Sequence, residues 1–206
     1  MLSSDEFPGR VITVKGHRYT VISQHAELDC ELSGKLLFGS DPEGLPKVGD
    51  WVTFLDYGDT GIITMVLQRR NMLARRKPGN SSERQILATN IDAALIVQSV
   101  DSNFNLMRLE RYIVQVTACG IYPVVVLNKI DLTDNPGEFK TKVQSLARDV
   151  SVVLCSTVTE SGLSQLWNLI RPGLTYILVG SSGVGKSSLL NRLMDDEIQP
   201  TGSISL

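Results

Sequence analysis

Eight residues near the C-terminal end of the printed chain have the types and spacing of a phosphate-binding loop. The run from Gly180 to Ser187, GSSGVGKS, fits the pattern G-x-x-x-x-G-K-[ST]. Its glycines let backbone N–H groups curl around phosphate oxygens, and a following helix adds its positive N-terminal end. We expect Lys186 to reach the β- and γ-phosphates and the Ser187 hydroxyl to bind Mg²⁺. The alternative, an accidental glycine-rich turn, does not explain why a strand-like segment precedes the loop and a helix-like one follows it.

A second pattern, Asn128-Lys129-Ile130-Asp131, follows the apolar run PVVVL. At a strand end this aspartate could accept hydrogen bonds from both N1–H and the 2-amino group of guanine, a two-point contact that adenine cannot return. We expect Asn128 to bind nearby loop groups or the base carbonyl, and the aliphatic stem of Lys129 to cover the base face. A helix-capping aspartate is the alternative. The combination with a phosphate-binding loop in the same sheet favours a guanine-nucleotide site.

Ser156-Thr157 follows the next apolar run, VVLC. GTP-binding domains usually have Ser-Ala at this turn, where backbone donors bind the guanine carbonyl. A helix start capped by Ser161 explains these residues equally well. The residues predicted to contact the nucleotide are therefore Asn128, Lys129, Ile130, Asp131, Ser156, Thr157, Gly180, Ser181, Ser182, Gly183, Val184, Gly185, Lys186, Ser187 and Ser188.

Alternating strands and helices surround these motifs from about residue 86 onward. The apolar run AALIVQSV has the length of a strand buried on both faces, and NLMRLERYIVQVTACG follows with apolar residues at helical spacing. The same alternation continues to the phosphate-binding loop. It predicts an α/β domain over residues 86–206, with a parallel sheet, helices on both faces and ligands at the carboxyl ends of the strands.

The N-terminal part reads differently. Residues 10–69 show short β segments separated by turns, which predicts a small all-β barrel over residues 1–72; the pattern fits an oligonucleotide-binding (OB) barrel and does not exclude an SH3-like one. Residues 73–85 read as a linker. Basic residues gather around it, either as contacts to an RNA backbone or as a solvated basic linker: Arg69, Arg70, Arg75, Arg76 and Lys77.

Composition narrows the protein class. The chain of 206 residues is 42% hydrophobic with a formal net charge of -2, so it is globular and any contact with nucleic acid must be local. Three widely spaced cysteines and two histidines argue against disulfides and against a zinc site within this chain. No segment has the length and apolarity of a membrane span or the pattern of a signal peptide. We expect a cytoplasmic monomer.

The order of the motifs, with the guanine motif before the phosphate-binding loop, resembles a circularly permuted GTPase. Together with the β-rich N-terminal part, the runs NFNLMRLERYIVQV, VVVLNKIDL and GSSGVGKSSLLN resemble the ribosome-small-subunit-dependent GTPase A family (RsgA, also called YjeQ) along essentially the whole chain. The resemblance implies an OB barrel, a permuted GTPase domain that uses GTP or GDP with Mg²⁺, and a C-terminal zinc-binding domain. It also implies GTP hydrolysis and nucleotide-dependent binding to the small (30S) ribosomal subunit and its rRNA late in maturation.

Several segments of that family are not recognised in this sequence. They include the D-x-P-G turn, the threonine-rich switch and the zinc-binding cluster, and Thr201 is not assigned to the switch. We therefore expect a fragment whose catalytic residue lies elsewhere and which turns over little GTP. Loss of the strands that follow the loop would also leave the phosphate-loop strand with an open edge. Two alternatives stay open: an RNA-binding module with a silent nucleotide scaffold, and an ATP-using P-loop protein, which Asp131 would distinguish.

Overall fold

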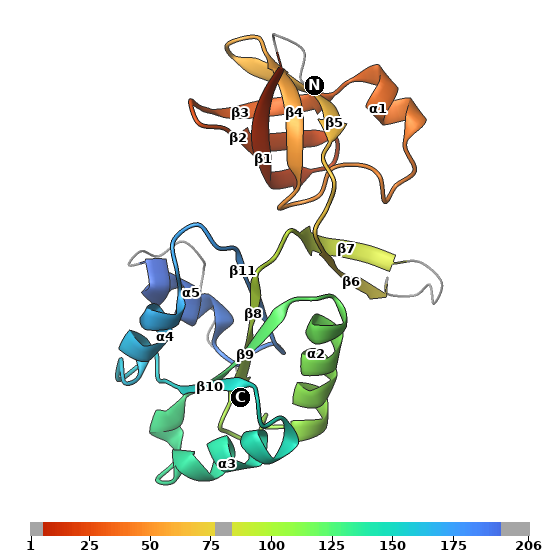
Figure 1. Cartoon of the computed structure of the whole chain (residues 1–206). Coiled ribbons are helices and arrows are strands. Elements are labelled where there is room, and N and C mark those ends of the chain that lie inside the picture. Colours follow the sequence, from red (N-terminus) through yellow and green to blue (C-terminus); the bar gives the residue numbers. More distant parts are fainter. Residues whose placement is uncertain (1–5, 77–83, 195–206) are drawn as a thin grey trace. The chain divides into compact units, whose positions relative to one another are not determined.

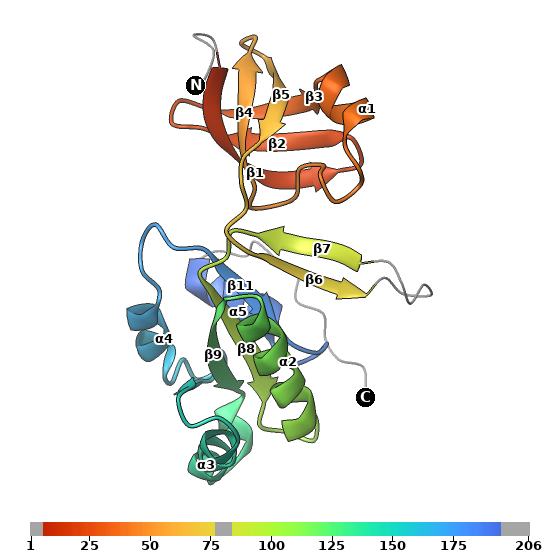
Figure 2. The same ribbon diagram turned by 45° about the vertical axis from the view of Figure 1, so that its right-hand side comes forward.

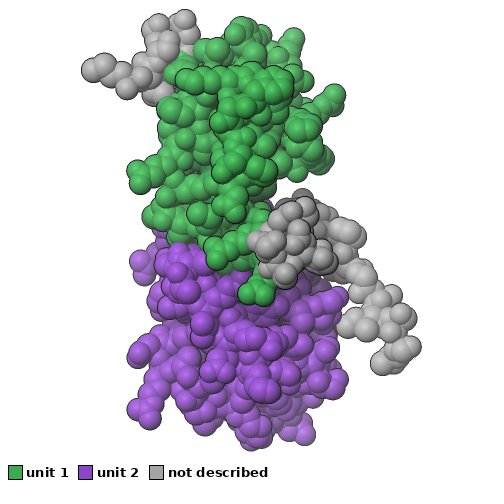
Figure 3. Space-filling model, turned by 90° about the vertical axis from the view of Figure 1, so that its right-hand side faces the viewer, with its two compact units in different colours: residues 1–91 green, residues 92–206 purple. Residues whose placement is uncertain are grey.

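A computed structural model describes residues 6–76 and 84–194. It divides the chain into two units, residues 1–91 and 92–206 (Figure 3). The sequence placed the boundaries at 72/73 and 85/86, and the stretch between them is not a plain linker. It contributes to a two-stranded antiparallel ribbon made of β6 (Met72–Arg76) and β7 (Arg84–Thr89), which is visible in Figure 1. Among the described residues, no helix is both long enough and apolar enough to cross a membrane.

Unit 1 is built on a closed five-stranded barrel. Its strands are β1 (Glu6–Lys15), β2 (Arg18–Ile22), β3 (Glu27–Leu32), β4 (Trp51–Asp56) and β5 (Thr60–Val66), in the order β1-β2-β3-β5-β4. The pairing of β4 with β1 closes the barrel, and a short helix, α1 (Gly34–Gly39), follows β3. Alternate residues point inward, as expected for strands with one solvated face. They form the core Val11, Tyr19, Val21, Leu28, Cys30, Val52, Phe54 and Ile63.

A buried carboxylate joins the ribbon to the barrel within unit 1. Asp50 is fully buried and accepts two parallel hydrogen bonds from Arg69, both 2.8 Å long. The Thr89 hydroxyl at the end of β7 donates to the same carboxylate at 2.7 Å, and the Lys47 backbone N–H at 2.8 Å. Arg69 also donates to two loop carbonyls, Glu43 and Leu45. Each group is therefore partnered, which a buried ion pair requires in order to offset its desolvation.

Unit 2 is an α/β domain with a parallel sheet of order β10-β9-β8-β11. The strands are β8 (Ala93–Ser99), β9 (Tyr122–Asn128), β10 (Ser151–Leu154) and β11 (Tyr176–Val179), and every residue of β8 is buried. The helical elements are α2 (Leu106–Ala118), the 3₁₀ turn η1 (Ile130–Leu132), α3 (Pro136–Leu146), α4 (Leu163–Leu169) and α5 (Lys186–Met194). The alternation expected from the sequence is confirmed.

Helices cover both faces of this sheet (Figures 1 and 2). On one face Leu166 of α4 and Leu189 of α5 share a core cluster with Leu95 of β8. The next residues along β8, Ala94 and Ile96, point to the opposite face. There α2 packs on β8 and β9 through its apolar stripe, and α3 packs on β10. In the described residues β11 has β8 as its one neighbour, so the strand leading to the phosphate loop is an edge strand, as expected.

We predict that Arg69→Gln destabilises unit 1 by about 3 kcal/mol, because it leaves the Asp50 carboxylate buried without its ion-pair partner. In a Trp167→Phe background the fluorescence of Trp51 reports on unit 1 during urea unfolding. The exposed Arg76 gives the matched control, and Arg76→Gln is expected to change the free energy of unfolding by no more than about 0.5 kcal/mol. Equal effects of the two substitutions would contradict a structural role for Arg69.

Candidate nucleotide-binding site

The phosphate-binding pattern lies between β11 and α5, the strand–loop–helix context that it requires. Three of its glycines have positive φ: 153° at Gly180, 77° at Gly183 and 93° at Gly185. These are conformations that other residues rarely adopt. A Cβ at Gly180 would also lie 2.4 Å from the Val97 carbonyl oxygen. The loop thus depends on glycine for its path, and α5 begins directly after it at Lys186.

The Lys186 side chain turns back over its own loop. Its ammonium donates to the carbonyl oxygens of Gly180 at 3.0 Å and Ser181 at 2.7 Å. Burial lowers the pKa of Lys186 from its ordinary value, because a charged group is poorly solvated there. A phosphate held inside the loop would bring negative charge to this ammonium, which carbonyl groups supply only in part.

Asn128 connects the guanine motif to the phosphate loop. It is the last residue of β9 and is fully buried, and its amide donates to the Val184 carbonyl at 3.0 Å. The amide oxygen accepts a bond from the Cys155 thiol at 3.7 Å, and burial raises the pKa of that thiol to about 12, so it stays a donor. Asn128 therefore binds loop groups, one of its two expected roles. A Cβ at Gly185 would lie 2.3 Å from the Asn128 amide nitrogen, so only glycine leaves room for it.

Asp131 lies in the exposed turn η1 and is held by the next strand end. The Ser156 hydroxyl donates a short hydrogen bond to one oxygen of its carboxylate. That hydroxyl also accepts from the backbone N–H groups of Val158 and Thr159, which fixes its orientation. The other Asp131 oxygen and the carboxylate's remaining acceptor positions are suited to a ligand with paired donors.

The structure of the turn after β10 tests one of the two interpretations of Ser156-Thr157, the helix start capped by Ser161. The residue that precedes α4 as its N-cap is Gly162, in a left-handed conformation and with no side-chain cap bond. Ser161 instead accepts a backbone hydrogen bond from Ser156 at 2.9 Å. The interpretation as a helix start capped by Ser161 is therefore wrong. The Thr157 carbonyl accepts a hydrogen bond from Arg192 of α5 at 3.3 Å. This bond connects the turn to the helix that follows the phosphate loop.

Two polar residues of the site were missed in the sequence. Asp101 follows the end of β8 and pairs with Lys129 at 3.0 Å, and Cys155 binds Asn128 as described. The sequence contained a signal for Asp101, because an acidic residue shortly after the end of a buried parallel strand lies at the edge of the sheet where ligands usually bind. Burial acts to raise the pKa of Asp101, but hydrogen bonds from Ser99 and Asn103 and the Lys129 ammonium outweigh it and lower the pKa below its ordinary value.

The other residues predicted to contact the nucleotide lie next to those described above. Ile130 begins η1, and its backbone N–H donates to the Cys155 carbonyl. Ser187 and Ser188 lie in the first turn of α5, beside Lys186. A single hydroxyl fits a Mg²⁺ ion whose other ligands are phosphate oxygens and water, the usual arrangement for this ion. The described residues contain no group of three or more His, Cys, Asp or Glu side chains that could hold a metal by itself.

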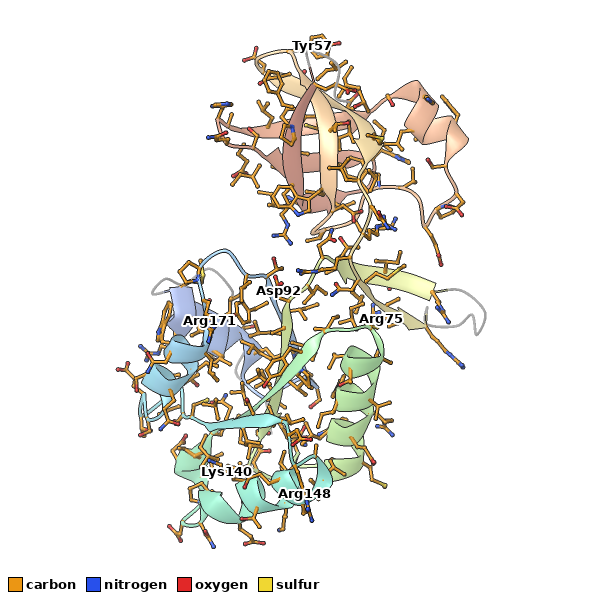
Figure 4. All side chains as sticks on the ribbon, in the orientation of Figure 1. Tyr57, Arg75, Asp92, Lys140, Arg148 and Arg171 are labelled. Carbon is orange, nitrogen blue, oxygen red and sulfur yellow. The ribbon has the colours of Figure 1, made fainter. Side chains whose placement is uncertain are left out.

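The basic residues proposed to contact RNA differ in their surroundings. Arg69 is 14% exposed and committed to Asp50, so we remove it from the candidate contacts as a correction. Arg75 and Arg76 are exposed on β6, where Figure 4 labels Arg75 on the ribbon. The backbone N–H of Arg70 donates to the Asn90 side chain, and Lys77 lies outside the described residues. Arg84, which was not singled out in the sequence, lies directly opposite Arg76 on β7.

Comparisons with known proteins agree with the motifs. Residues 66–206 match the family model described as RsgA GTPase. A relative from Bacteroides thetaiotaomicron, named small ribosomal subunit biogenesis GTPase RsgA 1, is 40% identical over 199 residues, which cover 96% of this chain and 56% of the relative. One from Methanosarcina acetivorans is 42% identical over 161 residues, covering 77% of this chain and 44% of the relative. The chain thus spans about half the length of these relatives.

Two crystal structures show the same fold. YjeQ from Thermotoga maritima has a TM-score of 0.74 and 26% identity, and the match covers 91% of this chain and 65% of YjeQ. YloQ, described as a circularly permuted GTPase, has a TM-score of 0.67 and 26% identity over 91% of this chain and 64% of YloQ. The predicted fold is confirmed: an OB-like closed barrel precedes a circularly permuted GTPase sheet with helices on both faces.

We predict that Gly185→Ala weakens binding of guanosine diphosphate at least tenfold, because the added Cβ displaces the Asn128 amide from the Val184 carbonyl. Titration with a fluorescent GDP analogue in Mg²⁺ measures the affinity. Gly173→Ala is the matched control, since Gly173 has a similar positive φ of 78° but no atom within 4 Å of the added Cβ. The clash is irrelevant to binding if the two variants lose the same affinity.

Proposed function

We propose, from the premise that the chain belongs to the RsgA GTPase family, that it carries the guanine-nucleotide site of a GTPase in small ribosomal subunit maturation. The observation that supports this most directly is the hydrogen bond from Asn128 to the Val184 carbonyl, since it ties a guanine-type motif to a phosphate-binding loop 56 residues away. The relatives' names supply the process: they are called small ribosomal subunit biogenesis GTPases.

The phosphates of the nucleotide would bind in the loop of residues 180–185. Backbone N–H groups of the loop and the N-terminal end of α5 would surround the β-phosphate. The Lys186 ammonium would exchange its two carbonyl partners for phosphate oxygens, and a charged acceptor is the stronger partner. Ser187 would bind Mg²⁺, which supplies positive charge to the phosphate oxygens when bound.

Guanine would bind between the ends of β9 and β10. The Asp131 carboxylate, oriented by Ser156, would accept from N1–H and the 2-amino group. The Lys129 stem would cover one face of the base, and backbone groups at Ser156 and Thr157 would meet its carbonyl. GTP hydrolysis is the activity we propose for the whole protein.

The described arginines of the ribbon are the proposed contacts to ribosomal RNA. Arg76 and Arg84 are Cα partners across the strands, a like-charge pair that destabilises a ribbon in water. Bound phosphate groups would relieve this repulsion, so the pair is suited to a nucleic-acid backbone. Binding to the subunit is proposed to depend on the nucleotide, in a cytoplasmic protein that acts as a monomer. The second candidate is an RNA-binding module whose nucleotide domain is a silent scaffold, and the ribbon charges favour RNA binding in either case.

We predict that the chain binds GDP in preference to ADP and that Asp131→Asn shifts the base preference from guanine to xanthine. The variant should bind GDP at least tenfold more weakly. It should bind xanthosine diphosphate more tightly, because the 2-oxo group of xanthine accepts a hydrogen bond where the 2-amino group of guanine donates one. Fluorescence-competition titrations measure all three nucleotides. Asp149→Asn removes the same charge from an exposed turn and should leave nucleotide affinity unchanged. Lys186→Ala should weaken the binding of all three nucleotides. Equal binding of GDP and ADP by the unmodified chain would disprove the guanine site and favour the ATP-using alternative.

For RNA we predict that replacing Arg75, Arg76 and Arg84 by glutamine weakens binding to small ribosomal subunits. The slope of log affinity against log salt should become shallower by about one for each phosphate group that an arginine no longer neutralises. Sedimentation with purified subunits at several salt concentrations measures both effects. Three arginines that are exposed on unit 2 provide a control triple with the same charge change: Arg111, Arg148 and Arg171. Figure 4 labels the last two. If the control triple weakens binding as much, net charge and not the ribbon is responsible.

A further inference from the structure

The turn between β8 and α2 places a carboxylate against the guanine motif. Asp101, which belongs to neither the phosphate loop nor the guanine motif, accepts a hydrogen bond and ion pair from the Lys129 ammonium at 3.0 Å. The two side chains are 19% and 21% exposed, so the pair is partly shielded from water. Interactions between charges are stronger under such partial burial than on an open surface.

The Asp101 carboxylate is held in place by its own turn. The Ser99 hydroxyl donates to it at 2.6 Å, and the backbone N–H of Asn103 donates to the same oxygen at 2.9 Å. The other oxygen is the one that receives Lys129. Both oxygens therefore have a defined partner, and the carboxylate has little freedom to rotate.

This turn is also fixed to the sheet. The backbone N–H of Val100 donates to the Asn128 carbonyl at 3.1 Å, and the buried Gln98 side chain donates to the Asn105 carbonyl at 3.2 Å. Phe104 packs edge-on against Phe139 of α3, with ring centroids 4.8 Å apart. Asp101 is thus positioned by strands and helices and not by a free loop.

The ion pair with Asp101 restricts the conformation of the long Lys129 side chain. Its backbone is left-handed, with φ 63° and ψ 37°, which sets the direction in which its side chain leaves the chain. Its four-carbon stem has many rotamers, and ordering a free lysine costs substantial side-chain entropy. An anchored ammonium fixes both ends of the stem before any ligand binds. A side chain ordered in advance reduces the free energy that binding would otherwise spend on ordering it.

We propose that Asp101 is a positioning residue of the guanine site, which holds the Lys129 stem in the place where it covers the base. Asp101 contacts Lys129 and not the nucleotide, so it acts on affinity for the base and leaves phosphate binding unchanged. The proposal rests on the proposed function, because it assigns a role within that site.

The test compares Asp101→Asn, Lys129→Met and the double variant, with GDP and inorganic pyrophosphate as ligands. Lys129→Met keeps an apolar stem but removes the ammonium. Calorimetric titration in the presence of Mg²⁺ should show that each single variant binds GDP about tenfold more weakly than the unmodified chain. The double variant should be no weaker than Lys129→Met, since both changes break one interaction. Pyrophosphate, which reaches only the phosphate loop, should bind all variants within about twofold of the unmodified chain.

Two further variants keep the outcome clear. Asp101→Glu retains the charge and should recover part of the GDP affinity, and Asp149→Asn should match the unmodified chain. If Asp101→Asn fails to fold, as judged by circular dichroism, the comparison of Asp101→Glu with Lys129→Met carries the test.

The proposal is overturned if Asp101→Asn leaves GDP affinity unchanged, if it weakens GDP equally in the Lys129→Met background, or if it weakens pyrophosphate as much as GDP. The second and third outcomes would mean that Asp101 supports the turn or the fold as a whole. Failure of the proposed function is distinguishable, because the unmodified chain would then show no preference for GDP over ADP.

Discussion

The buried amide of Asn128 is the contact on which the arrangement of the site depends. It donates to the Val184 carbonyl inside the glycine-rich loop and accepts from the Cys155 thiol, so the ends of β9 and β10 and the loop after β11 share one side chain. Each partner is buried, and a buried amide left without partners is costly. The proposed phosphate-binding and base-binding parts are therefore coupled through a structural hydrogen bond that needs no ligand.

Two further side chains make similar contacts at the edge of the sheet proposed to bind the base. Ser156 holds the Asp131 carboxylate, and Asp101 holds the Lys129 ammonium. In each case a residue at one strand end orients a residue at its neighbour. Parallel strands make this possible because their carboxyl ends meet at one edge of the sheet, where side chains from segments far apart in sequence come together. Circular permutation changes the order in which these strands occur along the chain but not which strand ends are neighbours.

Unit 1 differs, because its buried carboxylate is paired with groups of the same unit and joins the ribbon to the barrel. Asp50 and Arg69 satisfy each other and fasten β7 through Thr89, whereas the arginines farther along the ribbon remain exposed. A guanidinium can serve as a buried ion-pair partner or as a phosphate contact. In this unit Arg69 has the first use, and the exposed arginines a few residues away are proposed for the second. Burial and the presence of a carboxylate decide between them.

The sequence alone determined the local features of this protein. The glycine-rich loop, the lysine that follows it and the alternation of strands with helices depend on short-range spacing and backbone conformation, so residues 176–193 could be interpreted from their letters. The five-strand barrel was also predictable from turns and alternation. The tertiary structure decided which side chains meet: Arg69, a candidate RNA contact in the sequence, pairs with Asp50, and Lys129 of the guanine motif pairs with Asp101. The residues of these two pairs are 19 and 28 positions apart in the sequence, so the pairings depend on strand order and on how the turns pack. Such long-range contacts leave no periodic signal in the sequence, because only the folded sheet brings their residues together.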